Sequence, residues 1–326
     1  MAELAIPDLS DVLAARRRIA PYLKPTPLYS YPALDALTGT RVFVKHENHQ
    51  PVGAFKVRGG INLISQLGPD DRRRGVITAS TGNHGQSVAY AARVFDVPAV
   101  VCVPERANPV KLESMRALGA EVLSHGQDFD DAREYCEKLA AERGFRYIHS
   151  ANEPGLIAGV ATYTLEILAA LPDTDVIVVP VGGGSGAAGA CIVATAVRPS
   201  IEVVGVQSAA APAAYRSWLA RALVEDSTAT LAEGLATRTA FELTQRILWE
   251  RLDDFVLVSD AELTHATRLM IEKTRNLVEP AGAAALAAVL AAPGRFAGRR
   301  VAIVCSGGNI SPEQLVQLWP AVPAPS

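Results

Sequence analysis

Short apolar runs rich in Val and Ile alternate along the chain with longer stretches in which apolar residues recur at helical spacing. Strands are expected where the chain reads VITAS, AVVCV, EVLSH, RYIHS, VIVVPV, EVVGVQ, DDFVLVS and VAIVCS. Helices are expected between them, at about 86–95, 109–118, 129–143, 260–275 and 282–291. This alternation is typical of parallel α/β proteins. The continuously apolar strands favour sheets covered by helices on both faces.

The length of the chain predicts more than one domain. At about 150 residues per domain, 326 residues correspond to two. We expect two closely packed parallel-sheet domains, a large one formed by 1–75 and 151–326 and a small one formed by 76–150. The chain carries no low-complexity linker between these parts.

Composition narrows the classes of function. Hydrophobic residues make up 49% and charged residues 20%, as in ordinary globular proteins. A net charge of -3 gives no basic footprint for nucleic acid. We identify no signal peptide and no apolar stretch long enough to cross a membrane. The four cysteines form no CxxC pair, which favours buried free thiols and a reduced, cytoplasmic location.

A glycine-rich turn after an apolar strand is the first candidate site. Gly182–Gly186 opens a helix of small residues, where backbone N–H groups and the helix dipole bind phosphate. The alternative is a dinucleotide fingerprint, because Gly184–Gly189 matches G-x-G-x-x-G. That site also requires an acid at the end of the next strand, where this chain has Gln207. The phosphate interpretation is therefore favoured, although a simple packing turn would show the same glycines.

Three further segments carry candidate chemistry. Lys56 lies in PVGAFKVRGG, between an aromatic residue and glycines, and a partly desolvated lysine amine can form a Schiff base with an aldehyde. Ser80–Gln86 (STGNHGQ) follows a strand and offers hydroxyl and N–H groups for a carboxylate. Val304–Asn309 (VCSGGN) also follows a strand. Taken singly, a solvated lysine, an N-cap cluster and a turn would explain these segments equally well.

Together, the four segments resemble the serine/threonine dehydratase and serine racemase family of fold-type II pyridoxal-phosphate enzymes. The family signatures are similar to S-F-K-x-R-G-A, S-x-G-N-H-x-Q, a glycine-rich phosphate loop and a late S-G-G-N. The similarity extends from Thr26-Pro27-Leu28 to Asn309. It implies a fold like that of tryptophan synthase β, with pyridoxal 5'-phosphate in the large domain and a substrate loop in the small one.

The resemblance also implies a role for each matched residue. Lys56 would form the Schiff base and remove the α-proton, and Phe55 would pack against the cofactor ring. Asn83 would bind the 3-hydroxyl oxygen, Ser306 the pyridine nitrogen, and Glu279 would lie close to the cofactor. The phosphate would be held by Gly182, Gly183, Gly184, Ser185 and Gly186. The substrate carboxylate would be held by Ser80, Thr81, Gly82 and His84.

Departures from the family pattern bear on the substrate. Thr81 replaces the serine that acts as a second base in racemases, and its branched side chain restricts that role. The family's H-P-x-x-x-P reads His149–Pro154 (HSANEP) here. The expected substrate is of the threonine/serine type. If this stretch borders the pocket, the preferred substrate can differ from threonine, and a larger β-hydroxy amino acid such as a β-aryl serine or 3-hydroxyaspartate becomes a candidate. Glu233 is a candidate ligand for a monovalent or divalent cation.

The sequence thus predicts a dehydratase that converts a β-hydroxy-α-amino acid to a 2-oxo acid and ammonia. The alternatives are an amino-acid racemase, a 3-hydroxyaspartate dehydratase or, more remotely, a non-catalytic binding protein of the same fold. A β-replacement enzyme is disfavoured because its signature resembles S-x-K-D-R, and no Asp precedes Arg58 here. We expect a homodimer that binds a small amino-acid substrate and neither nucleic acid nor membrane.

Overall fold

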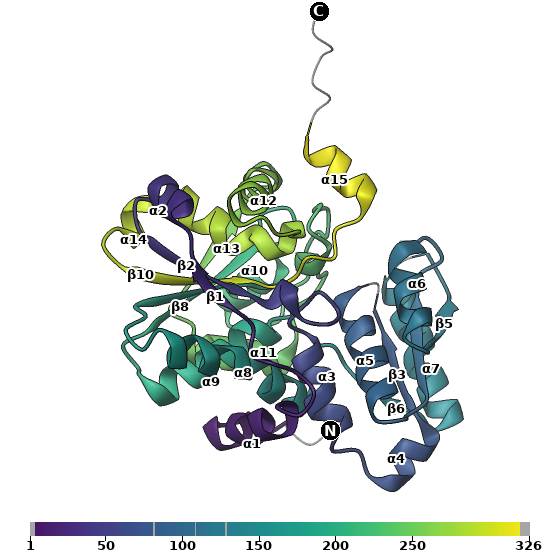
Figure 1. The fold of residues 1–326 in the computed structure, drawn as a ribbon. Coiled ribbons are helices and arrows are strands. Elements are labelled where there is room, and N and C mark those ends of the chain that lie inside the picture. Colours follow the sequence, from purple (N-terminus) through teal and green to yellow (C-terminus); the bar gives the residue numbers. More distant parts are fainter. Residues whose placement is uncertain (1–3, 81, 108, 128, 320–326) are drawn as a thin grey trace, which may run out of the picture.

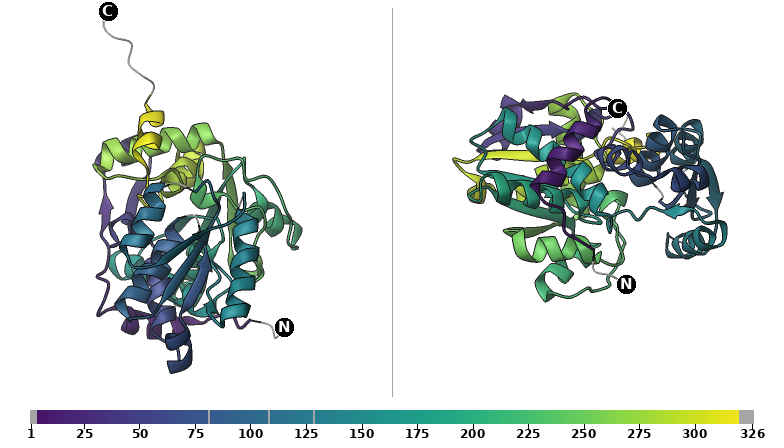
Figure 2. Two further views of the ribbon diagram at one scale, coloured as in Figure 1. Left: turned by 90° about the vertical axis from the view of Figure 1, so that its right-hand side faces the viewer. Right: turned by 90° about the horizontal axis from the view of Figure 1, so that it is seen from below.

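The computed structural model describes residues 4–80, 82–107, 109–127 and 129–319. They form two layered bodies that lie side by side, as Figure 1 and the view from below in Figure 2 show. Each body is built on its own sheet. The α/β architecture with mainly parallel strands confirms the predicted fold class.

The six-stranded sheet has the order β1-β2-β10-β7-β8-β9. All neighbouring strands run parallel except the edge strand β1, which is antiparallel to β2. The strands are β1 (Leu28–Ser30), β2 (Arg41–His46), β7 (Val176–Pro180), β8 (Glu202–Ser208), β9 (Asp254–Val258) and β10 (Arg300–Cys305). Parallel neighbours bring the carboxyl ends of β7 and β10 to the same edge of the sheet.

Helices cover both faces of this sheet because its strands are apolar on both sides. In β7, Val176 and Val178 join one core cluster, whereas Ile177 and Val179 join the other, as the period of two requires. One face is covered by α1 (Leu9–Ile19), α3 (Val57–Ile64), α8 (Pro154–Ala170), α9 (Ser185–Val197) and α11 (Glu242–Arg251). The other is covered by α2 (Pro32–Thr38), α12 (Asp260–Thr274), α13 (Pro280–Ala291) and α14 (Pro293–Phe296).

The four-stranded sheet has the order β5-β4-β3-β6 and is parallel throughout. Its strands are β3 (Val76–Ala79), β4 (Ala99–Val103), β5 (Glu121–Ser124) and β6 (Arg146–Tyr147). The helices α5 (Asn83–Val94) and α6 (Pro109–Ala117) pack on one face and α7 (Phe129–Arg143) on the other. The short helix α4 (Pro69–Arg74) precedes this sheet.

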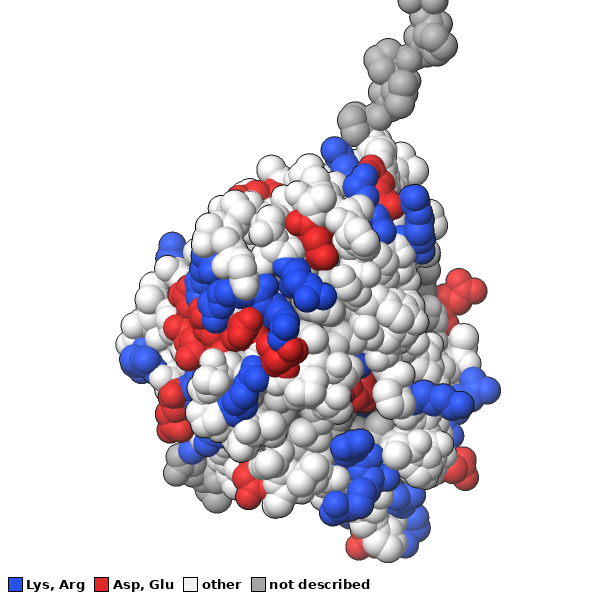
Figure 3. Space-filling model, turned by 60° about the vertical axis from the view of Figure 1, so that its left-hand side comes forward, with Lys and Arg blue, Asp and Glu red and all other residues white. Residues whose placement is uncertain are grey.

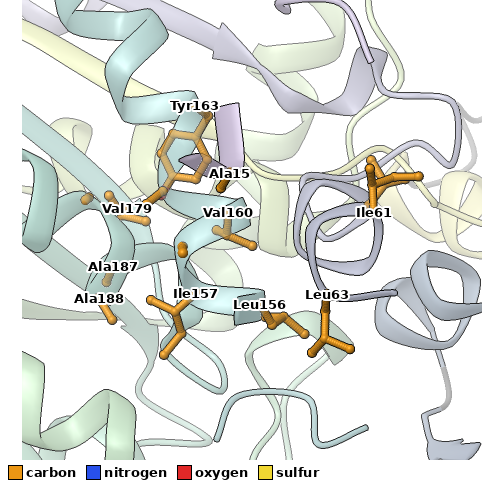
Figure 4. Close-up of a cluster of buried hydrophobic side chains, with 14 of the residues drawn as sticks. Ala15, Ile61, Leu63, Leu156, Ile157, Val160, Tyr163, Val179, Ala187 and Ala188 are labelled. Carbon is orange, nitrogen blue, oxygen red and sulfur yellow. The ribbon is translucent and has the colours of Figure 1, made fainter. Parts of the chain in front are cut away.

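Close packing of α8 against α3 and α9 forms the core beneath the site. Figure 4 shows Leu156, Ile157, Val160 and Tyr163 of α8 among buried side chains of neighbouring elements. Glycine permits this approach, because a Cβ at Gly189 of α9 would lie only 2.9 Å from the α8 backbone. The helix that carries the candidate lysine segment is thereby fixed to the helix that follows the glycine-rich turn.

Several predicted boundaries are confirmed and one is wrong. The helix at 129–143 is observed as predicted, and those at 260–275 and 282–291 agree within two residues. The strand predicted over RYIHS ends at Tyr147. The Ile148 N–H still donates to the Ile77 carbonyl of β3, but the His149 N–H donates to the Glu153 carboxylate at 3.4 Å instead of to a strand. The antiparallel edge strand β1 and helix α8 were not anticipated.

The surface carries charges of both signs and the cysteines are buried, as the composition predicts. On the face shown in Figure 3, basic and acidic side chains lie next to one another. Ion pairs such as Arg299–Glu202 (2.5 Å) join side chains of opposite charge in this protein. Within the described residues, no helix is both long and apolar enough to span a membrane. All four cysteines are free and buried, as predicted.

The remaining described α-helices are α10 (Ala213–Ala220) and α15 (Pro312–Leu318).

Candidate active site

A cavity of about 160 Å³ lies where the carboxyl ends of strands from both sheets face each other. We call it the reaction pocket. Every described residue that the sequence singled out as a candidate lines it: Phe55, Lys56, Ser80, Gly82, Asn83, His84, Gly182, Gly183, Gly184, Ser185, Gly186, Glu233, Glu279 and Ser306. Thr81 lies outside the described residues. Four segments far apart in the sequence therefore converge on one site.

Lys56 directly precedes α3 and extends its amine into this pocket. The Nζ atom donates to the Ser185 hydroxyl at 2.9 Å and to the Ser150 carbonyl at 3.1 Å. It also lies 5.3 Å from the centre of the Phe55 ring. Burial lowers the pKa of Lys56 to about 8, since the charged form is poorly solvated there. A minor fraction of the amine, much larger than for an ordinary lysine, is therefore neutral and nucleophilic near neutral pH.

The lysine segment is joined to the segment after β10. The Phe55 N–H donates to the Ser306 carbonyl at 3.1 Å, and the Gly308 N–H donates to the Gly53 carbonyl at 2.9 Å. An antiparallel bridge joins Ala54 to Gly307 between these two bonds. The Ser306 hydroxyl is thereby fixed at the pocket wall, where it donates weakly to the Ala281 carbonyl at 3.4 Å.

The glycine-rich turn forms a cradle at the start of α9. Gly184 has φ +88°, a left-handed conformation that favours glycine, and it caps a helix of 13 residues. A Cβ at Gly182 would lie 2.1 Å from the Gly234 carbonyl oxygen. Backbone N–H groups, the helix dipole and the Ser185 hydroxyl together favour an anion here. At the end of β8, the buried Gln207 stands where a dinucleotide site requires an acid.

The loop between β3 and α5 is ordered by its own side chains. The Ser80 hydroxyl accepts the N–H groups of Gly82 at 3.2 Å and Gly85 at 2.9 Å. Burial, assisted by the charge of Lys56, lowers the pKa of His84 to about 3, so this ring is neutral. Its Nδ1 is buried without a hydrogen-bond partner among the described residues. Because His84 lines the reaction pocket, a bound ligand would be able to supply the missing partner.

A chain of amides and a carboxylate connects this loop to the larger body. The Asn83 amide donates to Glu279 at 2.7 Å, and the Asn309 amide donates to the Asn83 oxygen at 2.7 Å. Burial raises the pKa of Glu279, while the charge of Lys111 and the Asn83 hydrogen bond oppose the shift. Gly307 leaves room for this carboxylate, because a Cβ there would lie 2.2 Å from Glu279 Oε1 and would displace it.

Glu233, the candidate cation ligand, pairs with a cationic side chain. Lys111 from α6 contacts its Oε2, and the Gln314 amide donates to its Oε1 at 3.2 Å. Among the described residues, no cluster of three or more His, Cys, Asp or Glu side chains could hold a metal ion. Lys111 thus links the smaller body to the larger one at the edge of the reaction pocket.

Sequence reasoning missed several residues of the pocket. Lys111, Phe129, Ser150, Thr237 and Phe241 also line it. The sequence offered one signal for these residues, the departure of His149–Pro154 from the family pattern. This stretch does border the pocket, through Ser150. Lys111 and the two phenylalanines stand in unremarkable contexts, so nothing in the sequence alone distinguishes them from ordinary surface or packing residues.

The pocket fits a cofactor that has both an aldehyde and a phosphate. Lys56 supplies an amine of lowered pKa, and the Gly182–Gly184 backbone supplies an anion cradle that side chains would fill. The Lys56 amine and the Ser185 hydroxyl at the first turn of α9 are 2.9 Å apart. One small molecule can therefore reach both groups.

Comparisons with known proteins agree with this geometry. Residues 19–307 match the family model described as pyridoxal-phosphate dependent enzyme. The chain is 38% identical over 304 residues to an L-threonine ammonia-lyase of Thermotoga maritima, covering 93% of this chain and 75% of that protein. It is 33% identical to an L-threo-3-hydroxyaspartate ammonia-lyase of Saccharomyces cerevisiae, covering 97% of each.

Solved structures give the same result. Maize serine racemase superposes with a TM-score of 0.92 at 32% identity, covering 96% of this chain and 97% of that one. The predicted resemblance, fold class and cofactor are therefore confirmed. The chain belongs to the family of pyridoxal-phosphate dependent enzymes, and its relatives are those of the fold-type II serine/threonine dehydratase group.

Proposed function

We propose that this protein is an ammonia-lyase that converts a β-hydroxy-α-amino acid to a 2-oxo acid and ammonia. The observation that carries the proposal is the Lys56 amine, held between the anion cradle and the Ser80–His84 loop. The ammonia-lyases of Thermotoga maritima and Saccharomyces cerevisiae support this class of reaction, because this chain is similar to them along almost its whole length.

Several residues would hold the cofactor. Gly182–Gly186 would bind its phosphate, and Lys56 its aldehyde carbon. Phe55, Asn83, Glu279 and Ser306 would surround its ring. When bound, pyridoxal phosphate delocalises the negative charge that develops at the substrate Cα. A neutral Ser306 hydroxyl, rather than a carboxylate, would leave the ring nitrogen unprotonated.

The chain's own groups would then bind and orient the substrate. The Ser80 hydroxyl and the backbone N–H groups at the start of α5 would hold the carboxylate, because a helix N-terminus binds anions. In the tautomer whose Nε2–H donates to the Ile148 carbonyl at 3.4 Å, His84 offers a hydrogen-bond acceptor at Nδ1. The Lys56 amine would take the α-proton, and its lowered pKa leaves part of it unprotonated at neutral pH.

The finer assignments are also proposals. We infer a homodimer in the cytoplasm, with a cofactor-binding domain formed by 1–75 and 151–326 and a substrate-loop domain formed by 76–150. The two separate sheets support that division. The likeness to maize serine racemase supports racemisation as a second candidate activity, in which Thr81 would act on the face opposite Lys56.

A spectrum and a product assay test the proposal. The purified protein loaded with pyridoxal phosphate should show a visible absorption band that is lost in Lys56→Ala. L-threonine and L-serine should yield 2-oxo acid, measured by coupled reduction, and ammonia in equal amounts. Racemisation would instead convert L-serine to D-serine. A protein with the band but neither product would contradict the lyase assignment while leaving the cofactor assignment intact.

A further inference from the structure

A second and larger cavity adjoins the reaction pocket. Its volume is about 360 Å³, against about 160 Å³ for the reaction pocket. Phe129, Thr237 and Phe241 line both cavities and therefore form the boundary between them. The rest of its wall comes from α7, from the 149–152 turn and from the 223–242 segment. A group attached to the reacting end of a substrate can extend across this boundary.

The wall of the second cavity nearest this boundary is aromatic. The ring of Phe241 meets that of His149 edge to face, with centroids 4.7 Å apart. His149 is held in one orientation, because its Nδ1 accepts the N–H groups of Ala151 at 3.0 Å and Asn152 at 2.9 Å. Burial, assisted by Lys56 and Arg133, lowers the pKa of His149 to about 4. The ring is therefore neutral and suited to contact with another ring.

The charged residues of this cavity are of both signs. Arg133, Arg238 and Glu242 line this cavity, and Arg133 lies 3.2 Å from Glu137. A carboxylate substituent would therefore compete with Glu137 for Arg133 and would share the cavity with Glu242. An uncharged ring incurs no such competition, because it needs only apolar and aromatic surface.

Size also favours a ring. A cavity of about 150 Å³ lined by apolar side chains accommodates benzene. The methyl group of threonine would leave almost all of the 360 Å³ unfilled. A β-aryl group would occupy it and would contact Phe129, Phe241 and His149 at once.

We propose that the second cavity is the subsite for the β-substituent of the substrate, and that it selects an aryl group, as in a 3-arylserine. This inference rests on the proposed lyase function and specifies its substrate class. Phe129, Phe241 and His149 are the specificity-determining residues.

The first test compares substrates on the wild-type holoenzyme. kcat/KM for 3-phenylserine should exceed that for L-threonine by at least about tenfold, the minimum expected when several carbons are added in a matching pocket. 3-Hydroxyaspartate should be a poorer substrate than 3-phenylserine. Binding gives a second readout: L-phenylalanine has the ring but no leaving hydroxyl, and calorimetry should show that it binds more tightly than L-alanine.

The second test fills the cavity. Thr239 is half-buried and Thr228 is exposed, and both line the second cavity alone. Thr239→Trp should lower the ratio of kcat/KM for 3-phenylserine to that for L-serine by at least about tenfold, and Thr228→Trp should lower it in the same direction. The control Leu219→Trp changes a residue that is 58% exposed and lines neither cavity, so the ratio should not change.

The outcomes separate this inference from the proposed function. If L-serine and L-threonine yield 2-oxo acid but L-threonine or 3-hydroxyaspartate surpasses 3-phenylserine, the lyase function holds and the aryl subsite is wrong. Equal ratios in Thr239→Trp and wild type would also overturn it. If no substrate yields 2-oxo acid but L-phenylalanine binds more tightly than L-alanine and Thr239→Trp removes the difference, the lyase function fails and the subsite stands.

Discussion

The two sides of the reaction pocket are held in different ways. On the lysine side, a buried cluster of charges lies beneath the first turn of α3. Arg58 donates to Glu47 at 2.7 and 2.8 Å and to Glu166 at 2.7 and 2.8 Å. Lys45 completes the cluster through Glu166 at 2.5 Å. Two cations and two anions thus compensate each other. One of the cations, Arg58, stands only two positions after Lys56 in the sequence.

Burial alone would disfavour these charges, and the pKa shifts show which effect prevails. Burial acts to raise the pKa of Glu47, but Arg58 and Lys45 outweigh it, and the pKa lies below its ordinary value. Burial likewise acts against the charge on Arg58, yet the two carboxylates raise its pKa. The charged forms of Glu47 and Arg58 are therefore favoured, whereas at Lys45 burial outweighs the nearby carboxylates and lowers the pKa. The cluster fixes the backbone that positions the reactive amine.

On the loop side, the links across the pocket are polar and partly open to water. The Asn83 amide reaches Glu279, and Lys111 reaches Glu233, whose side chain is 43% exposed. Solvent-exposed pairs contribute little to stability. The comparison teaches that the lysine side is fixed by a buried ion cluster. The loop side combines a hydrogen bond to the buried Glu279 with the half-exposed ion pair of Lys111 and Glu233, which binding can rearrange.

Removing the buried guanidinium of Arg58 should have the largest effect on stability, and it tests the difference between the two sides. Arg58→Met would leave Glu47 as an unpaired buried carboxylate, which should lower the free energy of unfolding by about 3–5 kcal/mol. Urea denaturation measures the loss. The control Arg73→Met removes an ion pair whose partners are both more than 70% exposed, and it should cost less than about 1 kcal/mol. Similar losses in both variants would mean that burial gives the cluster no special role.

The pH dependence of stability tests the lysine side without altering the cluster. The pKa of Lys56 is about 8 in the folded chain and about 10.5 when unfolded. Between these values the unfolded chain binds more protons at Lys56, so its contribution to stability rises with pH, by at most about 3 kcal/mol. In cofactor-free protein, the free energy of unfolding of wild type should therefore rise relative to that of Lys56→Met as the pH increases from 8 to 10. A constant difference would show that the lysine is not desolvated.

The contrast between the two sides also explains what the sequence could predict. Local patterns of glycine and hydroxyl residues follow the carboxyl ends of β3, β7 and β10, and Lys56 lies in a glycine-punctuated turn before α3. The described residues of these patterns that were predicted as site residues line the pocket: Lys56, Ser80, Gly82, Asn83, His84, Gly182–Gly186 and Ser306. Such patterns are visible because backbone geometry demands them locally. Strand–helix alternation predicted the fold for the same reason.

Contacts between distant segments were beyond the sequence. Glu166 reaches Arg58 across 108 positions and Lys111 reaches Glu233 across 122. Each of these residues looks like a solvated surface charge when it is considered alone. The second cavity shows the same limit, since its wall combines α7 with the 223–242 segment and no local pattern marks either as part of a site.

The glycine cradle offers a matched pair of variants of intermediate effect. Gly184 and Gly39 both have left-handed φ values, +88° and +67°, but a Cβ at Gly39 would contact nothing within 4 Å. Alanine at either position should lower stability by about 1–2 kcal/mol. Gly184→Ala should additionally weaken pyridoxal phosphate binding in equilibrium titrations, whereas Gly39→Ala should not. Equal affinity in the two variants would remove the cradle from the cofactor site.

The smallest expected effect on stability belongs to the link at the loop side. Lys111→Met removes the contact with Glu233. Because the Glu233 side chain is 43% exposed, the free energy of unfolding should change by less than about 1 kcal/mol. Because Lys111 and Glu233 lie on opposite sides of the reaction pocket, the variant should nevertheless raise KM for the amino acid. Lys138→Met, which removes a fully surface pair with Glu142, is the control and should leave KM unchanged. A loss of stability as large as that in Arg58→Met would abolish the distinction between the two sides, because the loop would then be held as firmly as the lysine.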